Sequence, residues 1–272
     1  MAQTEYAGVD LSVWNANVDY KTLKGASIEG RPLKFAMLRL SYGTTMDKRF
    51  DTHYKGCKAA GILVGAYHWL KSSTVAGAKR EAEYVVKLLR EGNYEMDYPV
   101  ALDFEDSALF ELNLPRAQYT ALVDAFLSII KAAGYYPMLY TNPAAIETKL
   151  DKTVIKHWDL WLAHWVTKPA QYGQTMWQYA ALGTTAEVAK QAATKVGRVD
   201  GIRGAVDVNI SYVGYAAKIR KLKNSTKLQM NNSDTGNYTI VAAKSAVKNS
   251  LAIEQKKLEA MGYTVVVLPT GK

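Results

Sequence analysis

Apolar residues along this chain gather into eight short runs that predict β-strands. Most of these runs are almost continuously apolar, which is typical of parallel strands that are covered on both faces. The runs are residues 6–12, 35–43, 63–71, 98–106, 137–142, 159–165, 176–180 and 204–211.

Helical patterns lie between the early runs. Residues 74–91 and 115–133 have apolar positions at helical spacing and each stops before a glycine, and a shorter helix is expected over residues 50–60. Alternating strands and helices predict a parallel α/β fold, and eight strands favour closure into a TIM-like barrel. Only ten residues, 166–175, join two of the later runs, too few for a helical crossover. We therefore predict an irregular barrel that is nearly all strand in its later part and has room for an antiparallel strand there.

A polar stretch follows the predicted barrel. We expect residues 1–221 to form the barrel domain and residues 222–237, rich in Asn, Ser and Thr, to be a linker or long loop. Residues 238–272 have the pattern of a strand, a helix over 245–261 and a second strand. Such a small module leaves an apolar sheet face and open edges, so we expect it to self-associate or to dock onto the barrel.

Composition is that of an ordinary globular protein, with 272 residues of which 49% are hydrophobic and 22% charged. The net charge of the chain is +9. Residues 222–272 contain seven Lys and three acidic residues, so this segment contributes +4 of the total. Positive charge favours approach to polyanions, either nucleic acid or an anionic cell-wall polymer, or serves solubility alone. The lysines are dispersed and no nucleic-acid motif accompanies them, so we expect no nucleic-acid partner.

Several classes of protein are excluded by what the sequence lacks. No apolar stretch reaches the ~18 residues of a membrane span, and the N-terminus has no secretory-signal pattern, so we expect neither membrane insertion nor signal-directed export. The single cysteine, Cys57, allows no intramolecular disulfide and is expected to be a buried thiol. The four histidines have no metal-binding spacing, and nucleotide and serine-hydrolase motifs are missing, so no metal or cofactor is expected. His68 is expected to be a hydrogen-bonded structural residue, or else to orient a carboxylate.

The segment YPVALDFED carries the strongest chemical signal. It places Asp103 and Glu105 two residues apart in a strand, so both side chains point the same way. Two carboxyls in unlike environments suit acid–base chemistry, while the alternative is a helix cap or an ion pair. Reactive groups of a parallel barrel gather at the C-terminal strand ends, where Asp10 and Asp207 are also expected. Crowding of these acids raises at least one pKa.

Aromatic and amide residues accompany the acids at the same strand ends. Flat aromatic faces with polar groups beside them suit sugar rings, although each aromatic residue alternatively fills the core. The candidate sugar-binding residues are Tyr67, Tyr140, Asn142, Trp177, Gln178 and Asn209.

Seven segments, in chain order between residues 6 and 213, together resemble glycoside hydrolase family 25, the muramidases also called Chalaropsis-type lysozymes. They are GVDLSVWNANVDY, AGILVGAYHWLK, PVALDFED, PMLYTN, LWLAHW, MWQY and VDVNIS. The resemblance implies a (β/α)5(β)3 barrel that hydrolyses the β-1,4 bond from N-acetylmuramic acid to N-acetylglucosamine in peptidoglycan. It also implies that Glu105 is the general acid and that an ionised Asp103 assists the acetamido group or stabilises positive charge. Asp10 and Asp207 match the remaining acids of the cleft.

The C-terminal module lies outside the resemblance, where phage lysins and bacterial autolysins of the family carry wall-binding domains. With no signal pattern, a phage endolysin is favoured, made in the host cytoplasm and acting on the bacterial cell wall; an autolysin stays open. The second hypothesis is a barrel that binds walls without hydrolysing them. The presence of both acids argues against it, because recognition alone needs no proton donor. Host, wall ligand, oligomeric state and stereochemistry do not follow from the sequence.

Overall fold

The computed structural model describes residues 5–166, 168–180, 198–231, 237–239 and 264–266. The chain divides into two compact units, residues 1–219 and 220–272. The elements of the first unit are β1 (Tyr6–Leu11), α1 (Tyr20–Gly25), β2 (Ser27–Ile28), β3 (Arg31–Tyr42), β4 (Thr45–Met46), α2 (Phe50–Ala59), β5 (Leu63–Trp69), α3 (Val75–Glu91), β6 (Val100–Asp103), α4 (Ser107–Glu111), α5 (Arg116–Ala132), β7 (Pro137–Thr141), α6 (Pro143–Thr148), α7 (Val154–His157), β8 (Asp159–Ala163), β9 (Met176–Ala180) and β10 (Asp207–Ser211). Helix α9 (Tyr215–Asn231) begins in the first unit and ends in the second.

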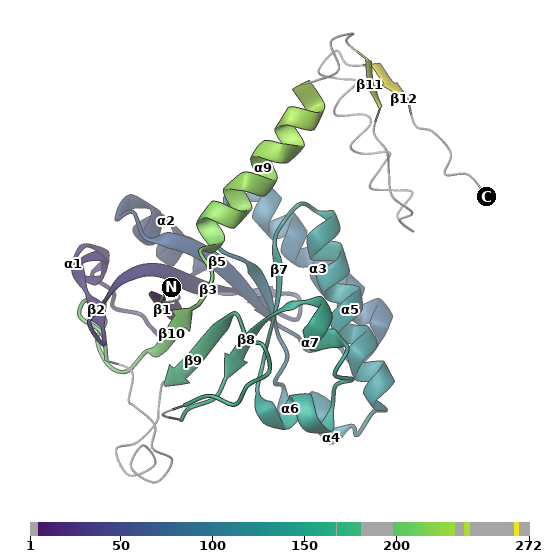
Figure 1. The fold of residues 1–272 in the computed structure, drawn as a ribbon, viewed down its shortest axis with the longest axis horizontal. Coiled ribbons are helices and arrows are strands. Elements are labelled where there is room, and N and C mark those ends of the chain that lie inside the picture. Colours follow the sequence, from purple (N-terminus) through teal and green to yellow (C-terminus); the bar gives the residue numbers. More distant parts are fainter. Residues whose placement is uncertain (1–4, 167, 181–197, 232–236, 240–263, 267–272) are drawn as a thin grey trace. The chain divides into compact units, whose positions relative to one another are not determined.

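Eight strands of the first unit close into a barrel (Figure 1). Their order is β1, β10, β9, β8, β7, β6, β5 and β3, and β3 pairs back with β1. Neighbouring strands are parallel except at β10, which runs antiparallel to both β1 and β9. The prediction of an irregular TIM-like barrel is therefore confirmed, and β10 is an antiparallel late strand of the kind for which that prediction left room.

Helices α3 and α5 lie side by side on the outside of the strands (Figure 1). The N-terminus of α3 is capped by Thr74, whose side chain accepts a hydrogen bond from the backbone N–H of Gly77 at 3.1 Å. The three helices expected among the early strands all form within one or two residues of their predicted ends. The short helices α1, α4, α6 and α7 were not predicted individually, because each is too short to show a clear apolar period.

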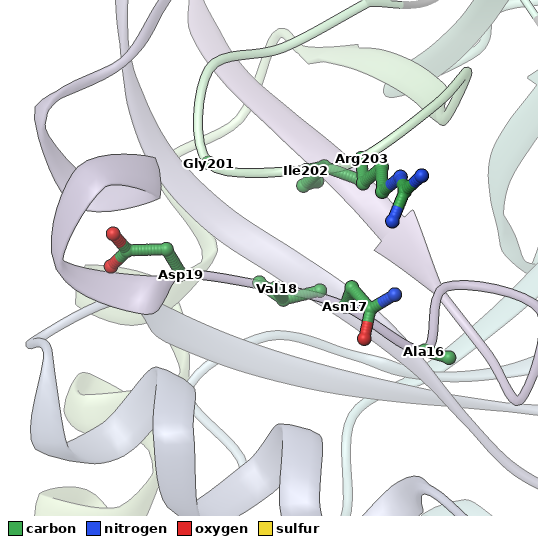
Figure 2. A pocket seen from close by; sticks show the side chains of 7 residues that line it. All are labelled: Ala16, Asn17, Val18, Asp19, Gly201, Ile202 and Arg203. Atoms are coloured by element: carbon green, nitrogen blue, oxygen red, sulfur yellow. The ribbon is translucent and has the colours of Figure 1, made fainter.

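Two loops extend the pairing of β1 and β10 beyond the rim of the barrel. Val18, in the loop after β1, forms an antiparallel bridge with Ile202, in the segment before β10. The backbone N–H of Arg203 also donates to the carbonyl of Asn17 at 3.3 Å. These two loops line an open pocket of about 590 Å³ (Figure 2).

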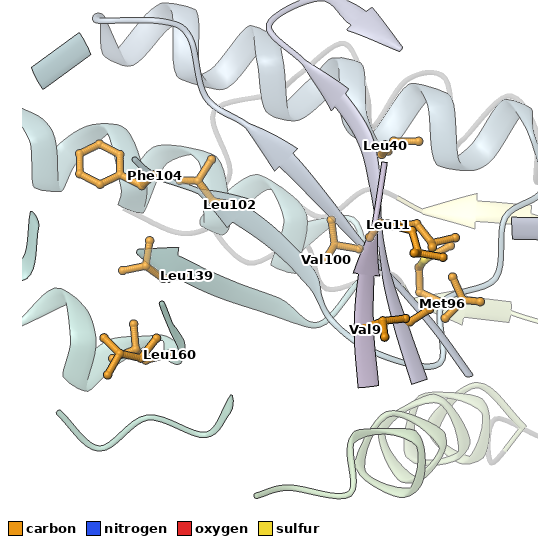
Figure 3. Close-up of a cluster of buried hydrophobic side chains, with 14 of the residues drawn as sticks. Val9, Leu11, Leu40, Met96, Val100, Leu102, Phe104, Leu139 and Leu160 are labelled. Atoms are coloured by element: carbon orange, nitrogen blue, oxygen red, sulfur yellow. The ribbon is translucent and has the colours of Figure 1, made fainter. Parts of the chain in front are cut away.

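Strand alternation sorts the buried side chains into an outer and an inner layer. Outward-facing residues form one hydrophobic cluster, which includes Val9, Leu11, Leu40, Met96, Val100, Leu102, Phe104, Leu139 and Leu160 (Figure 3). Inward-facing residues form a second cluster, consisting of Phe35, Met37, Tyr98, Ala101, Met138, Tyr140, Trp161, Ala163, Met176, Tyr215 and Ile219. Within it the rings of Phe35 and Tyr98 stack with centroids 4.3 Å apart. Gly8 leaves room for that stack, because a Cβ there would lie 2.5 Å from the Phe35 ring.

The second unit differs from the prediction at its beginning. Residues 222–231 continue helix α9, so the long-loop alternative is wrong over this range, and the linker alternative stays a prediction. A helix that already exists needs no new nucleation, and Lys, Leu, Gln and Met extend it readily. Further along, β11 (Asn237–Thr239) pairs in parallel with β12 (Thr264–Val266). Both overlap the predicted strands, and the helix expected over 245–261 lies outside the described residues.

Candidate active site

Four acidic residues meet at one rim of the barrel. Asp10 is the next-to-last residue of β1, Asp103 ends β6, and Glu105 follows two residues later. Asp207 begins β10 and lies opposite Asp10 in the ladder, because the reversed β10 brings its first residue to the rim where its parallel neighbours end. Burial raises the pKa of Tyr140, and the charges of all four acids raise it further. The four predicted acids therefore all lie near enough to one buried side chain to act on its charge.

Two amide side chains hold the carboxylate of Asp10. Its Oδ2 accepts hydrogen bonds from Asn209 Nδ2 at 2.9 Å and from Gln178 Nε2 at 3.1 Å. Each amide is itself oriented, since Trp161 Nε1 donates to Asn209 Oδ1 at 2.8 Å and the Tyr140 hydroxyl donates to Gln178 Oε1 at 3.0 Å. Burial raises the pKa of Asp10, and the hydrogen bonds from the two amides lower it. Orienting Asp10 is a role that sequence analysis did not assign to these amides.

The carboxyl of Glu105 titrates near neutrality. Burial raises the pKa of Glu105 to about 7, the charge of Asp10 adds to this effect, and the Tyr140 hydroxyl opposes it. Burial also raises the pKa of Asp103 well above its usual range, helped by the charges of Glu105 and Asp10, while Arg39 lowers it. This structure thus favours protonation in the Asp103–Glu105 pair. The ionised Asp103 implied by the family resemblance needs an additional positive charge or N–H donor.

Two residues on neighbouring strands each carry a buried polar atom without a partner. Asp103 and Trp69 lie opposite each other on β6 and β5. Within the described part of the chain, Asp103 Oδ1 and Trp69 Nε1 are both buried without a hydrogen-bond partner. A buried polar atom in this condition costs about 1–3 kcal/mol. A free acceptor and a free donor on paired residues suit a ligand that carries both kinds of group, as an acetamido substituent does.

Arg39 is a buried cation at this site that sequence analysis missed. It extends from β3, and its Nε donates to Asp47 Oδ2 at 2.7 Å. The same Asp47 oxygen accepts from the backbone N–H of Val13 at 3.0 Å, which ties this ion pair to the loop that follows β1. The signal was the only charged residue in the apolar run 35–43, two residues beyond the inward-facing Met37.

The structure does not bring every predicted sugar-binding residue to the rim. Trp177 lies on the opposite face of β9 from Gln178, in the outer hydrophobic cluster, and its Nε1 donates to the carbonyl of His164 at 2.7 Å. Asn142 caps α6, where its Oδ1 accepts from the backbone N–H of Ala145 at 3.0 Å.

Tyr67 does lie among the acids. Burial raises the pKa of Tyr67, and the charges of Asp10, Asp103 and Asp207 raise it further. Its ring meets that of Trp161 edge-on, with centroids 6.1 Å apart. Together with Tyr140, whose ring centroid is 4.5 Å from that of Trp161, it forms an aromatic wall beside the carboxyls.

His68 has the structural role that we expected as one alternative. Its Nδ1 is 2.8 Å from Ser41 Oγ and its Nε2 is 2.7 Å from Glu81 Oε2, so both ring nitrogens are engaged away from the rim acids. Cys57 is a buried free thiol, as expected. Among the described residues, no group of three or more His, Cys, Asp or Glu side chains is arranged to hold a metal ion. Nor does the described part of the chain contain a helix with the length and apolar character needed to cross a bilayer.

Two buried carboxyls and two half-buried ones at the rim of a barrel, one of them with a pKa raised to about 7 and with aromatic rings among them, are typical of a glycoside-hydrolase site. Comparison with known proteins leads to the same class. The family description "Glycosyl hydrolases family 25" matches residues 9–188, and the chain belongs to this family.

The relatives include lysozymes from bacteria and from a phage. Lysozyme M1 of Streptomyces globisporus is 28% identical over 239 residues, which cover 80% of this chain and 71% of that protein. Lysozyme of Lactococcus phage mv1 is 27% identical over 175 residues, 61% of this chain and 82% of that protein. The crystal structure of the bacterial lysozyme from Streptomyces coelicolor superposes with a TM-score of 0.62 at 25% identity, covering 83% of this chain and all of that one. The chain is thus a peptidoglycan hydrolase of the muramidase type, and nothing favours the alternative of an inactive barrel.

Proposed function

We propose that Glu105 is the general acid that protonates the leaving oxygen of the β-1,4 bond between N-acetylmuramic acid and N-acetylglucosamine. The observation that supports this role most directly is the pKa of Glu105, which burial raises to about 7. A carboxyl with this pKa keeps part of its proton near neutral pH and still gives it up readily. Its donation allows the sugar to develop oxocarbenium character as the bond breaks.

Asp103 is proposed to face the acetamido group of the same sugar. Its unpartnered Oδ1 would accept the amide N–H or lie against the developing positive charge. Either contact stabilises the carboxylate form and offsets the effect of burial on its pKa. The proton that Asp103 and Glu105 hold between them then resides on Glu105, where it is needed.

Asp10 and Asp207 are proposed to complete the acidic cleft by holding water or sugar hydroxyls. The charge of Asp10 also helps to keep the pKa of Glu105 high. Tyr67 and Tyr140 would form the aromatic wall for the sugar. Gln178 and Asn209 act through Asp10, which they orient. Trp177 would not contact the sugar, because it packs in the outer hydrophobic cluster. Asn142 would contribute only its Nδ2, because its Oδ1 caps α6.

Substitution of Glu105 tests this proposal. Purified cell walls are treated with Glu105→Gln, and new reducing ends are counted, with mass spectrometry to identify the terminal sugar. We expect the variant to release almost none while it still sediments with walls. The matched control is Glu111→Gln, an exposed residue at the end of α4, which should keep full activity. Undiminished release by Glu105→Gln would remove it from the acid role, and new amino groups instead of reducing ends would indicate a different bond.

The C-terminal unit is proposed to be a wall-binding module that follows the catalytic barrel. Its support is the +4 charge from residue 222 onward, which suits an anionic wall polymer. Binding of the full chain to walls should weaken when the polymer is removed or the salt concentration is raised. Light scattering across a range of concentrations tests self-association, and a constant monomer mass would exclude it.

The biological setting is proposed from one relative. Similarity to the lysozyme of Lactococcus phage mv1 favours a phage endolysin that is made in the host cytoplasm and acts on the cell wall from within. Expression together with a membrane-permeabilising protein should lyse a susceptible host, and expression of the chain alone should not. Lysis without that second protein would argue against this setting.

A further inference from the structure

We infer that the open pocket between the loops flanking β1 and β10 binds a carboxylate of the peptide stem carried by peptidoglycan. This inference rests on the proposed function, because it places a second part of the same substrate. The pocket is lined by Ala16, Asn17, Val18, Asp19, Gly201, Ile202 and Arg203 (Figure 2).

The pocket lies close to the proposed cleavage site. Arg203 is four residues before Asp207, and Ala16 is six residues after Asp10. Four residues span at most about 14 Å even when fully extended. Asp10 and Asp207 are partners in the barrel, and the bridge between Val18 and Ile202 continues their pairing. A substituent on a sugar in the cleft therefore lies within reach of the pocket.

The charge of the pocket favours an anion at the end where Arg203 lies. Arg203 is exposed, and within the described residues its guanidinium makes no ion pair or side-chain hydrogen bond. The side chains of Asn17 and Arg203 extend into the same gap between the loops, while Asp19 lies at the other end (Figure 2). The Asp19 carboxylate is engaged as the N-cap of α1, where Oδ1 accepts from the backbone N–H groups of Lys21 and Thr22 at 3.1 Å each.

The chemistry of the substrate indicates which anion this is. A guanidinium fork binds a carboxylate through two parallel hydrogen bonds, and the amide of Asn17 can add a third donor. Carboxylates in peptidoglycan belong to the peptide stem or, where the stem has been removed, to the lactyl group of the sugar itself. The stem is the group long enough to leave the cleft and cross the rim. The loop also carries Trp14, whose side chain is 74% exposed and offers an apolar surface for stem side chains.

The experiment compares three soluble glycans of equal length: one with peptide stems, one whose stem carboxyls are converted to amides, and one without stems. Arg203→Ala, Arg203→Lys and the matched control Arg198→Ala are assayed as full chains for kcat and KM. Arg198 is an exposed arginine of the same segment that does not line the pocket.

For stem-bearing glycan we expect Arg203→Ala to raise KM about fivefold to thirtyfold and to leave kcat unchanged. The lower value corresponds to the loss of an exposed ion pair and the upper value to the loss of a bidentate one. The KM of Arg203→Lys should lie between those of Arg203→Ala and the unsubstituted chain, and the KM of Arg198→Ala should equal that of the unsubstituted chain. On the other two glycans all variants should have the same KM as the unsubstituted chain. An equal effect on all three glycans, or none on any, overturns the inference. An effect confined to stem-free glycan overturns it in favour of the lactyl carboxylate. Failure of the unsubstituted chain to release reducing ends from any glycan would instead overturn the proposed function.

Discussion

Removal of the negative charge of Asp10 should lower the pKa of Glu105. Burial and then the Asp10 charge are the largest causes that raise this pKa, from 4.5 to about 7. The rise in pKa corresponds to about 3 kcal/mol in favour of the protonated form. Because burial contributes more than Asp10, we expect Asp10→Asn to lower the pKa of Glu105 by about half a unit to one unit, or ~1 kcal/mol.

The substitution is close to isosteric. The new amide oxygen can accept the two hydrogen bonds that Gln178 and Asn209 now donate to Asp10 Oδ2, so the barrel should keep its structure. The assay is the pH profile of kcat/KM on soluble glycan, measured on whatever activity the variant retains. In the unsubstituted chain the alkaline limb should fall near pH 7, where Glu105 loses its proton.

In Asp10→Asn the alkaline limb should move to lower pH by half a unit to one unit. Asp200→Asn, an exposed acid in the segment before β10, serves as the control and should leave the limb in place. If the limb of Asp10→Asn stays where it was or moves to higher pH while the fold is intact, the electrostatic coupling between Asp10 and Glu105 is refuted.

Three further predictions concern stability. Because the pKa of Glu105 is raised in the folded state, stability should fall as the pH rises from the usual value of 4.5 to about 7, and the full penalty should be present at pH 8. Denaturant titration of Glu105→Gln should therefore give a free energy of unfolding about 1–3 kcal/mol higher at pH 8, with no gain at pH 4. A variant no more stable at pH 8 would contradict this. Arg39→Met removes the cation that pairs with the buried carboxylate of Asp47, so it should lower the free energy of unfolding by about 3–5 kcal/mol in the same assay. The control Arg31→Met breaks an ion pair that is one-third exposed and should lower it by less than about 1 kcal/mol. Equal losses in the two variants would refute this prediction. Gly8→Ala places a Cβ against the Phe35 ring and should lower the free energy of unfolding by about 1–3 kcal/mol. Gly25→Ala places its Cβ in open space and should leave stability unchanged. A lower melting temperature for Gly25→Ala than for Gly8→Ala would contradict this.

The sequence predicts the barrel well because its signals are local. Continuous apolar runs mark the strands, and a ten-residue connection such as 166–175 is too short for a helix. The predicted loop at residues 222–231 fails for a related reason. Polar composition indicates that a segment is exposed to solvent, but it does not distinguish a loop from an exposed helix. Here a helix that is already nucleated continues through the polar residues.

The candidate active site is only partly predictable from the sequence. Asp103 and Glu105 are predicted to share a face because strand alternation acts over two residues. The hydrogen bonds that orient Asp10 come from residues 168 and 199 positions away, and no local pattern reports such pairs. Strand alternation predicts that Trp177 and its neighbour Gln178 lie on opposite faces of the strand. Only the structure shows which of the two is inside.

The central claim is that crowding and burial keep the Glu105 carboxyl protonated close to neutral pH. A direct measurement is the ¹³C NMR titration of the carboxyl carbon of Glu105 in chain labelled at glutamate, with the signal assigned by its loss in Glu105→Gln. The account predicts a midpoint near pH 7, well above the usual 4.5. A midpoint below pH 5 would contradict it, because Glu105 would then have no proton to donate at the pH where walls are cleaved.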